Sequence, residues 1–199
     1  MFHVEFAGVT SSVKVFNPLT QRSLTATGGG GAVNLNIELV KNFRSITNNF
    51  FSDGAGRYIF GQAPDAIIRG DGSPSFVHSF SDVTGFELKA GKTELYVYYG
   101  GVYINKNTAI DPANGKLVGY GFPGSPAGQN RSIQEATFGF TQTFWRDPKY
   151  GALQLMGQYS YLTRSPWAVP TGSPANAHTN MVFINLRYRL PGSAPKTGK

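Results

Sequence analysis

Ser132–Trp145 reads SIQEATFGFTQTFW and alternates between apolar and polar side chains through most of its length. One parity carries Ala136, Phe138, Phe140 and Phe144, and the other carries Glu135, Thr137, Gly139, Thr141 and Thr143. Successive side chains of a β-strand point to opposite faces, so this two-residue period predicts a strand with one apolar and one polar face.

Two further runs near the end of the chain repeat this pattern. The run 151–164 sets Leu153 against Gln154, and the run 178–190 continues the same alternation. Each run is about 13 residues long, whereas strands of soluble proteins are commonest near roughly 5–6 residues. A tilted membrane-spanning strand needs roughly 9–11 residues. The length of these runs therefore favours a transmembrane β-barrel.

The composition fits a membrane wall made of strands. Charged residues make up 15% of the 199, against roughly 25% in an ordinary soluble protein. No window approaches 18 apolar residues, so the sequence excludes a membrane helix, and only a closed barrel would satisfy every backbone group in lipid. The net charge is +7, but the 18 Lys and Arg are scattered and no RNA-binding signature occurs, so we expect no nucleic-acid partner.

The same period, followed toward the N-terminus, predicts eight strands at 2–16, 31–40, 43–51, 78–89, 93–104, 131–145, 151–164 and 178–190. The connections alternate between two classes. Short turns fall at 40–42, 90–92 and 146–150, and long loops rich in Gly, Pro, Asn and Ser fall at 17–30, 52–77, 105–130 and 165–177. This sidedness is typical of outer-membrane barrels, which have turns in the periplasm and loops outside.

The predicted fold is therefore an all-β, antiparallel, up-and-down transmembrane barrel over 1–190, closed or as an open partial barrel, followed by a polar tail at 191–199. A water-filled interior needs polar side chains on the inner face of the strands. The predicted lumen-lining residues are Asn34, Asn36, Glu38, Glu135, Thr137, Thr141, Thr143, Gln154, Gln158, Ser160, Asn185, Arg187 and Arg189. The same face could be the solvent side of an ordinary antiparallel sheet, but strand length and loop asymmetry favour a lumen.

Aromatic residues collect where the predicted strands end. Aromatic girdles mark the two lipid–water interfaces of membrane barrels. The predicted interface residues are Trp145, Tyr150 and Tyr188 on the periplasmic side, and Phe16, Phe50, Tyr161 and Trp167 on the outer side.

Glycine-aromatic pairs punctuate the strands, as in Tyr98–Gly101 and Phe138–Phe140, and the final strand reads VFINLRYRL at 182–190. On these features the chain resembles bacterial outer-membrane β-barrels of the porin type, in particular a C-terminal segment. The resemblance implies passive diffusion of small hydrophilic solutes, contact with outer-membrane lipid, insertion by the outer-membrane assembly machinery and a homo-oligomer such as a trimer. It implies no cofactor. Porins usually end on an aromatic residue, whereas here Leu190 and a polar tail end the chain.

The beginning of the sequence departs from that of an exported protein. Met1–Phe6 enters a strand pattern at once, without a basic segment, an apolar segment or a cleavage site. Either a signal peptide has been removed, or the chain is the C-terminal portion of a longer protein. We favour the second interpretation, because eight strands close only a narrow barrel, whereas long loops suit larger ones.

Two other functions fit an all-β chain: a soluble β-barrel that binds a small ligand, and a narrow barrel that acts as a membrane anchor or adhesin. The first needs an apolar inner face and a polar outer face, the reverse of the pattern above. The second needs a filled interior.

Short motifs in the sequence do not support an enzyme or a metal site. The neighbours His78 and Ser79 resemble the pair used by some membrane-embedded lipases, but the similarity ends there. The three histidines lack metal-ligand spacing, and the aspartates of 53–71 fit no calcium-loop pattern. The glycine run 28–31 lacks the Lys-Ser/Thr pair of a phosphate loop and is interpreted as a flexible loop end. We expect no catalytic residue and no metal.

Overall fold

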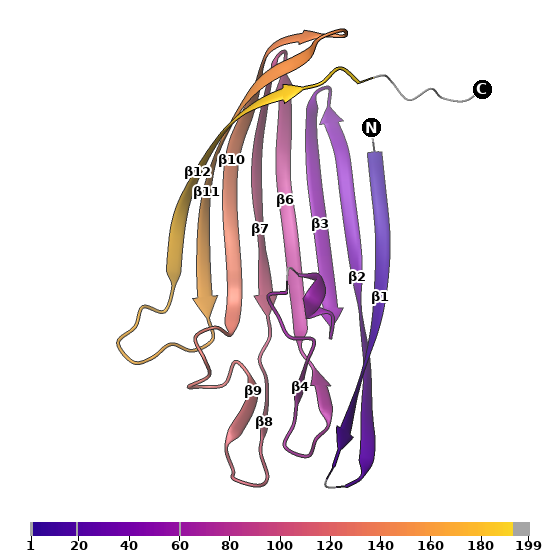
Figure 1. The fold of residues 1–199 in the computed structure, drawn as a ribbon, viewed down its shortest axis with the longest axis vertical. Coiled ribbons are helices and arrows are strands. Elements are labelled where there is room, and N and C mark those ends of the chain that lie inside the picture. The colour runs from indigo at the N-terminus through magenta and orange to yellow at the C-terminus, as the bar shows by residue number, and fades with distance from the viewer. Residues whose placement is uncertain (1, 19, 60, 193–199) are drawn as a thin grey trace, which may run out of the picture.

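The computed structural model describes residues 2–18, 20–59 and 61–192. Its main element is one antiparallel sheet of eight strands in the order β1-β2-β3-β6-β7-β10-β11-β12 (Figure 1). The strands of this sheet are β1 (Phe2–Asn17), β2 (Arg22–Val40), β3 (Phe43–Asp53), β6 (His78–Ala90), β7 (Thr93–Ile104), β10 (Asn130–Asp147), β11 (Gly151–Pro166) and β12 (Ala177–Arg189).

The predicted all-β, antiparallel, up-and-down architecture is confirmed, and each of the eight predicted strands is present. The sheet is open. In the described part of the chain, β1 and β12 form its two edges and do not pair with one another. Among the same residues, no helix is long and apolar enough to cross a membrane. Of the predicted tail, residues 193–199 lie outside the described part.

The two ends of the sheet differ as the connection lengths predict. The short turns, the start of β1 and the end of β12 lie at one end of the sheet, which we call the turn end (Figure 1). The other end, the loop end, carries the hairpin of β4 (Ala66–Ile68) and β5 (Pro74–Phe76) and the hairpin of β8 (Asn107–Ile110) and β9 (Leu117–Tyr120). A single turn of 3-10 helix, η1 (Gly56–Tyr58), follows β3.

The first predicted loop is wrong. Residues 22–30 belong to β2, and the glycine run 28–31 pairs with both β1 and β3. Figure 1 shows β1 and β2 continuing as a long hairpin at the loop end. The physical reason is packing: the Phe76 ring lies so close to the Gly28 backbone that a Cβ there would meet ring carbons at 2.8 Å. These glycines leave room for an aromatic ring to pack and do not serve to make the chain flexible.

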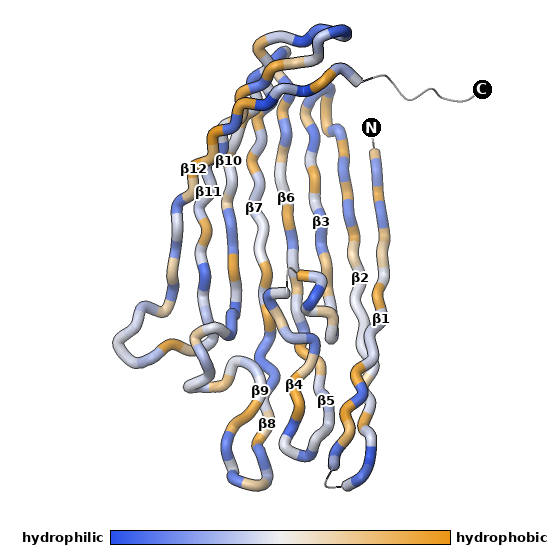
Figure 2. The backbone as a smooth tube through the Cα atoms, in the orientation of Figure 1, coloured by the Kyte–Doolittle hydropathy of each residue, from blue (hydrophilic) through white to orange (hydrophobic). Residues whose placement is uncertain are grey.

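The two faces of the sheet carry different side chains. Figure 2 shows hydrophilic and hydrophobic residues following one another along the long strands. The strand register puts Thr137, Ser160 and Tyr98 on one face, here called the inner face, and Phe138, Tyr159 and Val97 on the opposite, outer face. The outer face is apolar and exposed: the exposed fraction is 70% for Val182, 78% for Ile184 and 67% for Leu186.

Candidate functional site

The inner face carries a continuous hydrogen-bonded network across its centre. The hydroxyls of Thr137 and Ser160 lie 2.8 Å apart, and the Gln158 amide donates to Ser160 at 3.1 Å. The Tyr96 hydroxyl donates to the Gln158 carbonyl at 3.1 Å, and Thr137 donates to Glu135 at 3.0 Å. Nearer the turn end, Gln154 donates to Thr143 at 3.0 Å. The network links side chains of β7, β10 and β11, so these polar groups are held in fixed positions.

Two tyrosines of β7 extend this network toward β3. The Tyr98 hydroxyl donates to Glu87, which also forms an ion pair with Arg44. The two tyrosine rings lie 5.5 Å apart, and each covers a glycine of the neighbouring strand: Tyr98 covers Gly85, and Tyr96 covers Gly139. A Cβ at either glycine would collide with the ring, so the glycines give the tyrosines room to lie flat on the sheet.

A hollow of about 720 Å³ lies on the inner face between this network and the loop end. Its lining combines apolar side chains, among them Phe50, Val102 and Leu162, with polar ones, among them Glu135 and Arg164. That volume lies within the roughly 300–1,000 Å³ range of small-molecule sites.

At the loop end, packed side chains cover the inner face of the sheet. A buried cluster, here called the loop cluster, consists of Ile59, Ala63, Ile67, Val77, Ile104 and Tyr120. The Tyr58 ring of η1 meets the Phe50 ring edge-on at 6.4 Å, and Figure 1 shows η1 lying against the sheet. The segment that follows β3 therefore folds back over the inner face and narrows its loop end.

The loop cluster contains a tyrosine whose titration can be measured. The Tyr120 hydroxyl donates to the Asn130 carbonyl at 2.8 Å, and burial raises the pKa of this phenol to about 12. Because the folded pKa exceeds the ordinary value of about 10, this group's contribution to stability is complete below about pH 10 and is lost as the pH rises toward 12. We expect a spectrophotometric titration to lose one phenol of high pKa in Tyr120→Phe. An unchanged titration curve would contradict this assignment.

The predicted lumen residues share the inner face by strand register. The structure joins Glu135, Thr137, Gln158 and Ser160 in the central network and pairs Thr143 with Gln154. It also places Thr141 on β10, opposite Met156. Asn34, Asn36 and Glu38 lie on β2, where Glu38 pairs in register with Arg44 and accepts a hydrogen bond from the Asn42 backbone at 2.9 Å. Asn185, Arg187 and Arg189 lie exposed on the edge strand β12.

The sequence pattern does not assign several residues to the inner face. Tyr96 and Tyr98 were ambiguous because aromatic residues occupy both parities of β7. Arg44 and Glu87 lie on strands with weak alternation, and Arg164 stands at the end of a predicted strand. Gly85 and Gly139 lie on the two strands that flank β7 and leave room for the tyrosine rings. These glycines are therefore the sequence signal that indicates which face carries Tyr96 and Tyr98.

The predicted interface aromatics occupy both ends of the sheet. At the turn end, Trp145 and Tyr188 lie 6.0 Å apart, and the Tyr188 hydroxyl donates to the Tyr150 carbonyl. At the loop end, the Tyr161 ring lies 5.8 Å from His178. Trp167 differs, because its indole packs against the loop cluster and donates to the Ile104 carbonyl at 3.0 Å. Trp167 thus holds the loops in place instead of pointing freely outward.

The interface prediction is wrong for Phe50. Its ring lies on the inner face, where it lines the hollow and meets the Tyr58 ring.

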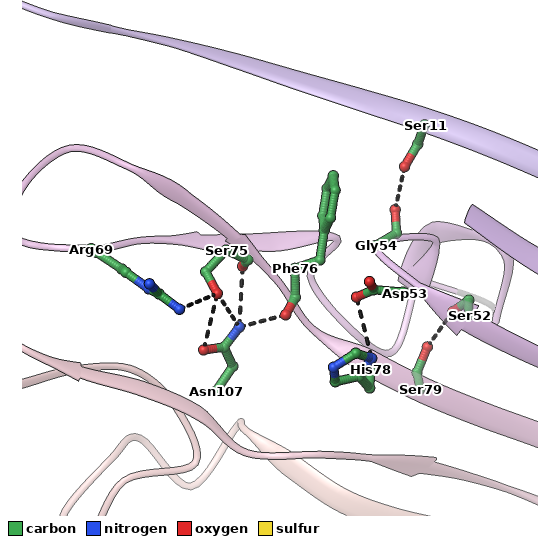
Figure 3. A network of polar contacts seen from close by, with 10 residues as sticks. All are labelled: Ser11, Ser52, Asp53, Gly54, Arg69, Ser75, Phe76, His78, Ser79 and Asn107. Atoms are coloured by element: carbon green, nitrogen blue, oxygen red, sulfur yellow. Dashed lines mark hydrogen bonds and ion pairs between the residues drawn. The ribbon is translucent and has the colours of Figure 1, made fainter. Parts of the chain in front are cut away.

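His78 and Ser79 do not form a catalytic pair. His78 lies 3.2 Å from Asp53, whereas Ser79 shares a hydrogen bond of 2.7 Å with Ser52 (Figure 3). Successive residues of β6 point to opposite faces, so the imidazole is turned away from the hydroxyl it would have to deprotonate. In the described residues no group of three or more His, Cys, Asp or Glu side chains is placed to hold a metal ion.

No protein-family model, curated protein or solved structure matches this chain.

Proposed function

We propose that this chain forms part of the wall of a bacterial outer-membrane channel for the passive diffusion of small hydrophilic solutes. The observation that carries the proposal is the contrast between the two faces of one long-stranded sheet. The outer face exposes apolar and aromatic side chains, whereas the inner face carries the hydrogen-bonded polar network and the hollow. A membrane barrel needs this arrangement, with lipid outside and water inside.

The exposed apolar surface argues against a soluble ligand-binding barrel. Exposed large apolar side chains occur along all eight long strands, including Phe6, Val33, Phe138 and Ile184. Soluble monomers rarely expose contiguous apolar patches beyond a few hundred Å². A soluble barrel would also place its polar side chains outside, where this sheet has its apolar ones.

The inner-face hollow favours a channel over a filled anchor. An anchor barrel packs its interior with side chains. Here the strands leave a hollow of about 720 Å³, although the segment after β3 narrows the loop end.

The open edges of the sheet require partner strands in lipid. In the described residues, β1 and β12 each pair with one strand only, so the backbone groups along their other edge have no partner strand. Unpaired backbone groups are not tolerated in the hydrocarbon region, so further strands would have to complete the wall. Those strands could come from the same polypeptide or from another copy.

One polar patch interrupts the apolar outer face and favours the expected homo-oligomer. Thr47 and Thr84 share a hydrogen bond of 2.6 Å, and Asn49 pairs in register with Asp82 beside them. Polar groups on a lipid-exposed face are costly. A neighbouring copy covering this patch, as in a trimer, would remove it from lipid.

Fractionation tests the proposal. The full-length protein should be found in the outer membrane and should migrate differently on gels before and after heating, as folded membrane barrels do. Recovery in the soluble fraction, with heat-independent mobility, would refute the proposal.

We expect a modest preference for anions. Arg187 and Arg189 lie on the inner side of β12 by register, and no ion pair in the described residues compensates them, whereas Arg44 is paired with Glu87. Guanidinium groups stay charged, and low-dielectric walls focus their field across the lumen. Glu38 and Glu135 on the same face weaken the effect.

Reversal potentials in planar bilayers measure this preference. The full-length protein should favour anions, more strongly at low salt because screening is weaker there. Arg187→Gln/Arg189→Gln should reduce the preference. Cation preference in the parent, or no shift in the double variant, would sink the assignment.

A further inference from the structure

The floor of the hollow consists of two neighbouring rows of residues that cross six strands of the sheet. Strand register defines each row, because residues directly opposite one another on adjacent strands share a face. The first row is Asn34, Asn48, Val83, Gly100, Glu135 and Leu162. The second row, one step nearer the loop end, is Ala32, Phe50, Ser81, Val102, Ile133 and Arg164.

The floor is apolar at its centre and carries two opposite charges on its β10–β11 side. At the centre, β6 and β7 contribute Val83, Gly100 and Val102 together with the single hydroxyl of Ser81, whereas Glu135 and Arg164 project from β10 and β11. These two charged residues are diagonal neighbours, which places their Cα atoms about 7–8 Å apart. A head group that carries both charges therefore has an opposite charge to meet on each of the two strands.

Each charged group is fixed by hydrogen bonds of its own. Glu135 accepts from Thr137 at 3.0 Å. Arg164 donates from Nε to the Asn130 side chain at 2.5 Å and from Nη2 to the Ala127 carbonyl at 2.6 Å. Within the described residues, Glu135 and Arg164 form no ion pair with each other. The hollow therefore presents a fixed anion and a fixed cation beside an apolar surface.

We propose that the hollow binds a zwitterionic α-amino acid with an apolar side chain during its passage. This inference rests on the proposed channel function and names its preferred solute class. The free N–H groups of Arg164 receive the carboxylate, and Glu135 receives the ammonium group, as charge-assisted hydrogen bonds favour. The apolar side chain of the solute covers Val83 and Val102.

Other small solutes leave part of this site without a partner. An uncharged sugar satisfies neither charge and covers the apolar centre with hydroxyl groups. An N-acylated amino acid keeps the carboxylate but offers no ammonium group to Glu135. A polar group that loses its hydrating water and gains no hydrogen-bond partner disfavours binding. The sugar and the N-acylated amino acid should therefore bind more weakly than the free amino acid.

Block of ion current through the full-length protein in planar bilayers tests the inference. The probes are L-leucine, N-acetyl-L-leucine and glucose. We expect L-leucine to reduce single-channel current at a concentration about tenfold lower than either of the others, the effect of one lost charged hydrogen bond. Equal half-blocking concentrations for the three probes would overturn the inference.

Variants locate the binding site. Arg164→Gln and Glu135→Gln should each raise the half-blocking concentration of L-leucine about tenfold, whereas Arg164→Lys, which keeps the charge, should restore part of the block. Arg22→Gln removes the same charge from the exposed start of β2, outside the hollow, and should leave the block unchanged. Heat-modifiable mobility of each variant verifies folding.

The outcomes separate the two proposals. Ion channels that L-leucine blocks no better than glucose, or a block that Arg164→Gln and Arg22→Gln weaken equally, would overturn the amino-acid inference and leave the channel intact. Absence of any conductance from folded, membrane-inserted parent protein would overturn the channel itself, and the solute inference with it.

Discussion

Ile184→Arg should destabilise the protein in lipid by about 2–4 kcal/mol, the cost of a cationic side chain near the midplane of a barrel wall. Ile184 lies near the middle of β12 on the outer face, and the residue is 78% exposed. In the channel proposed above, that exposed surface faces lipid.

Asn185→Arg is the matched control. The position is adjacent on the same strand and receives the same side chain, but register pairs it with Met156 on the inner face. A charge that faces water should cost much less. The measurement is the free energy of unfolding of the full-length protein in lipid vesicles by denaturant titration. Equal destabilisation by the two variants would show that the facing assigned to β12 is wrong.

Gly28→Ala should cost about 1–3 kcal/mol of stability, the usual penalty for overpacking. A Cβ at Gly28 would meet the Phe76 ring at 2.8 Å and would also collide with the Asp53 carbonyl oxygen. Neither neighbour can withdraw easily, because Asp53 is part of β3 and Phe76 is part of β5.

Gly31→Ala controls for the change in glycine content. A Cβ at Gly31 would have only the Ala7 carbonyl oxygen within reach, at 3.8 Å. We expect no loss of stability there, and a slight gain because the unfolded chain loses conformational freedom. The same unfolding titration applies. If the two alanines had equal effects, the glycine run would act through flexibility rather than through packing.

The long strands could be predicted because each one carries its own signal. In β10, β11 and β12, alternating polarity runs through most of the strand, and the structure reproduces these strands within a few residues of the predicted bounds. Alternation is a property of a single strand and needs no knowledge of its neighbours.

The start of β2 could not be predicted for the opposite reason. Residues 22–30 contain small and polar side chains, and without knowledge of the neighbouring strands their glycines are typical of a loop. Their pairing depends on β1, where Ser11 faces Gly28 and Val13 faces Ala26, and on the Phe76 ring. A strand stabilised by its partners has little signal of its own.

The candidate site was predictable only in part. Polar parity identifies inner-face residues such as Thr137 and Gln158, but the hollow depends on which strands are neighbours and in what register. Glu135 and Arg164 are diagonal neighbours because β10 and β11 pair in this particular register. The folding of the segment after β3 over the inner face, through Tyr58 and Phe50, is likewise a tertiary event that no local pattern encodes.

Accessibility of single cysteines distinguishes a face of the sheet that meets lipid from a face that meets water. The chain contains no cysteine, so each introduced thiol is the only one it contributes. Val182→Cys and Ile184→Cys represent the outer face of β12, and Asn185→Cys and Arg187→Cys represent its inner face. We expect a membrane-impermeant maleimide to label the inner-face pair in proteoliposomes of the full-length protein and to leave the outer-face pair unlabelled. Labelling of all four sites alike, or of the outer-face pair alone, would contradict this assignment of the two faces.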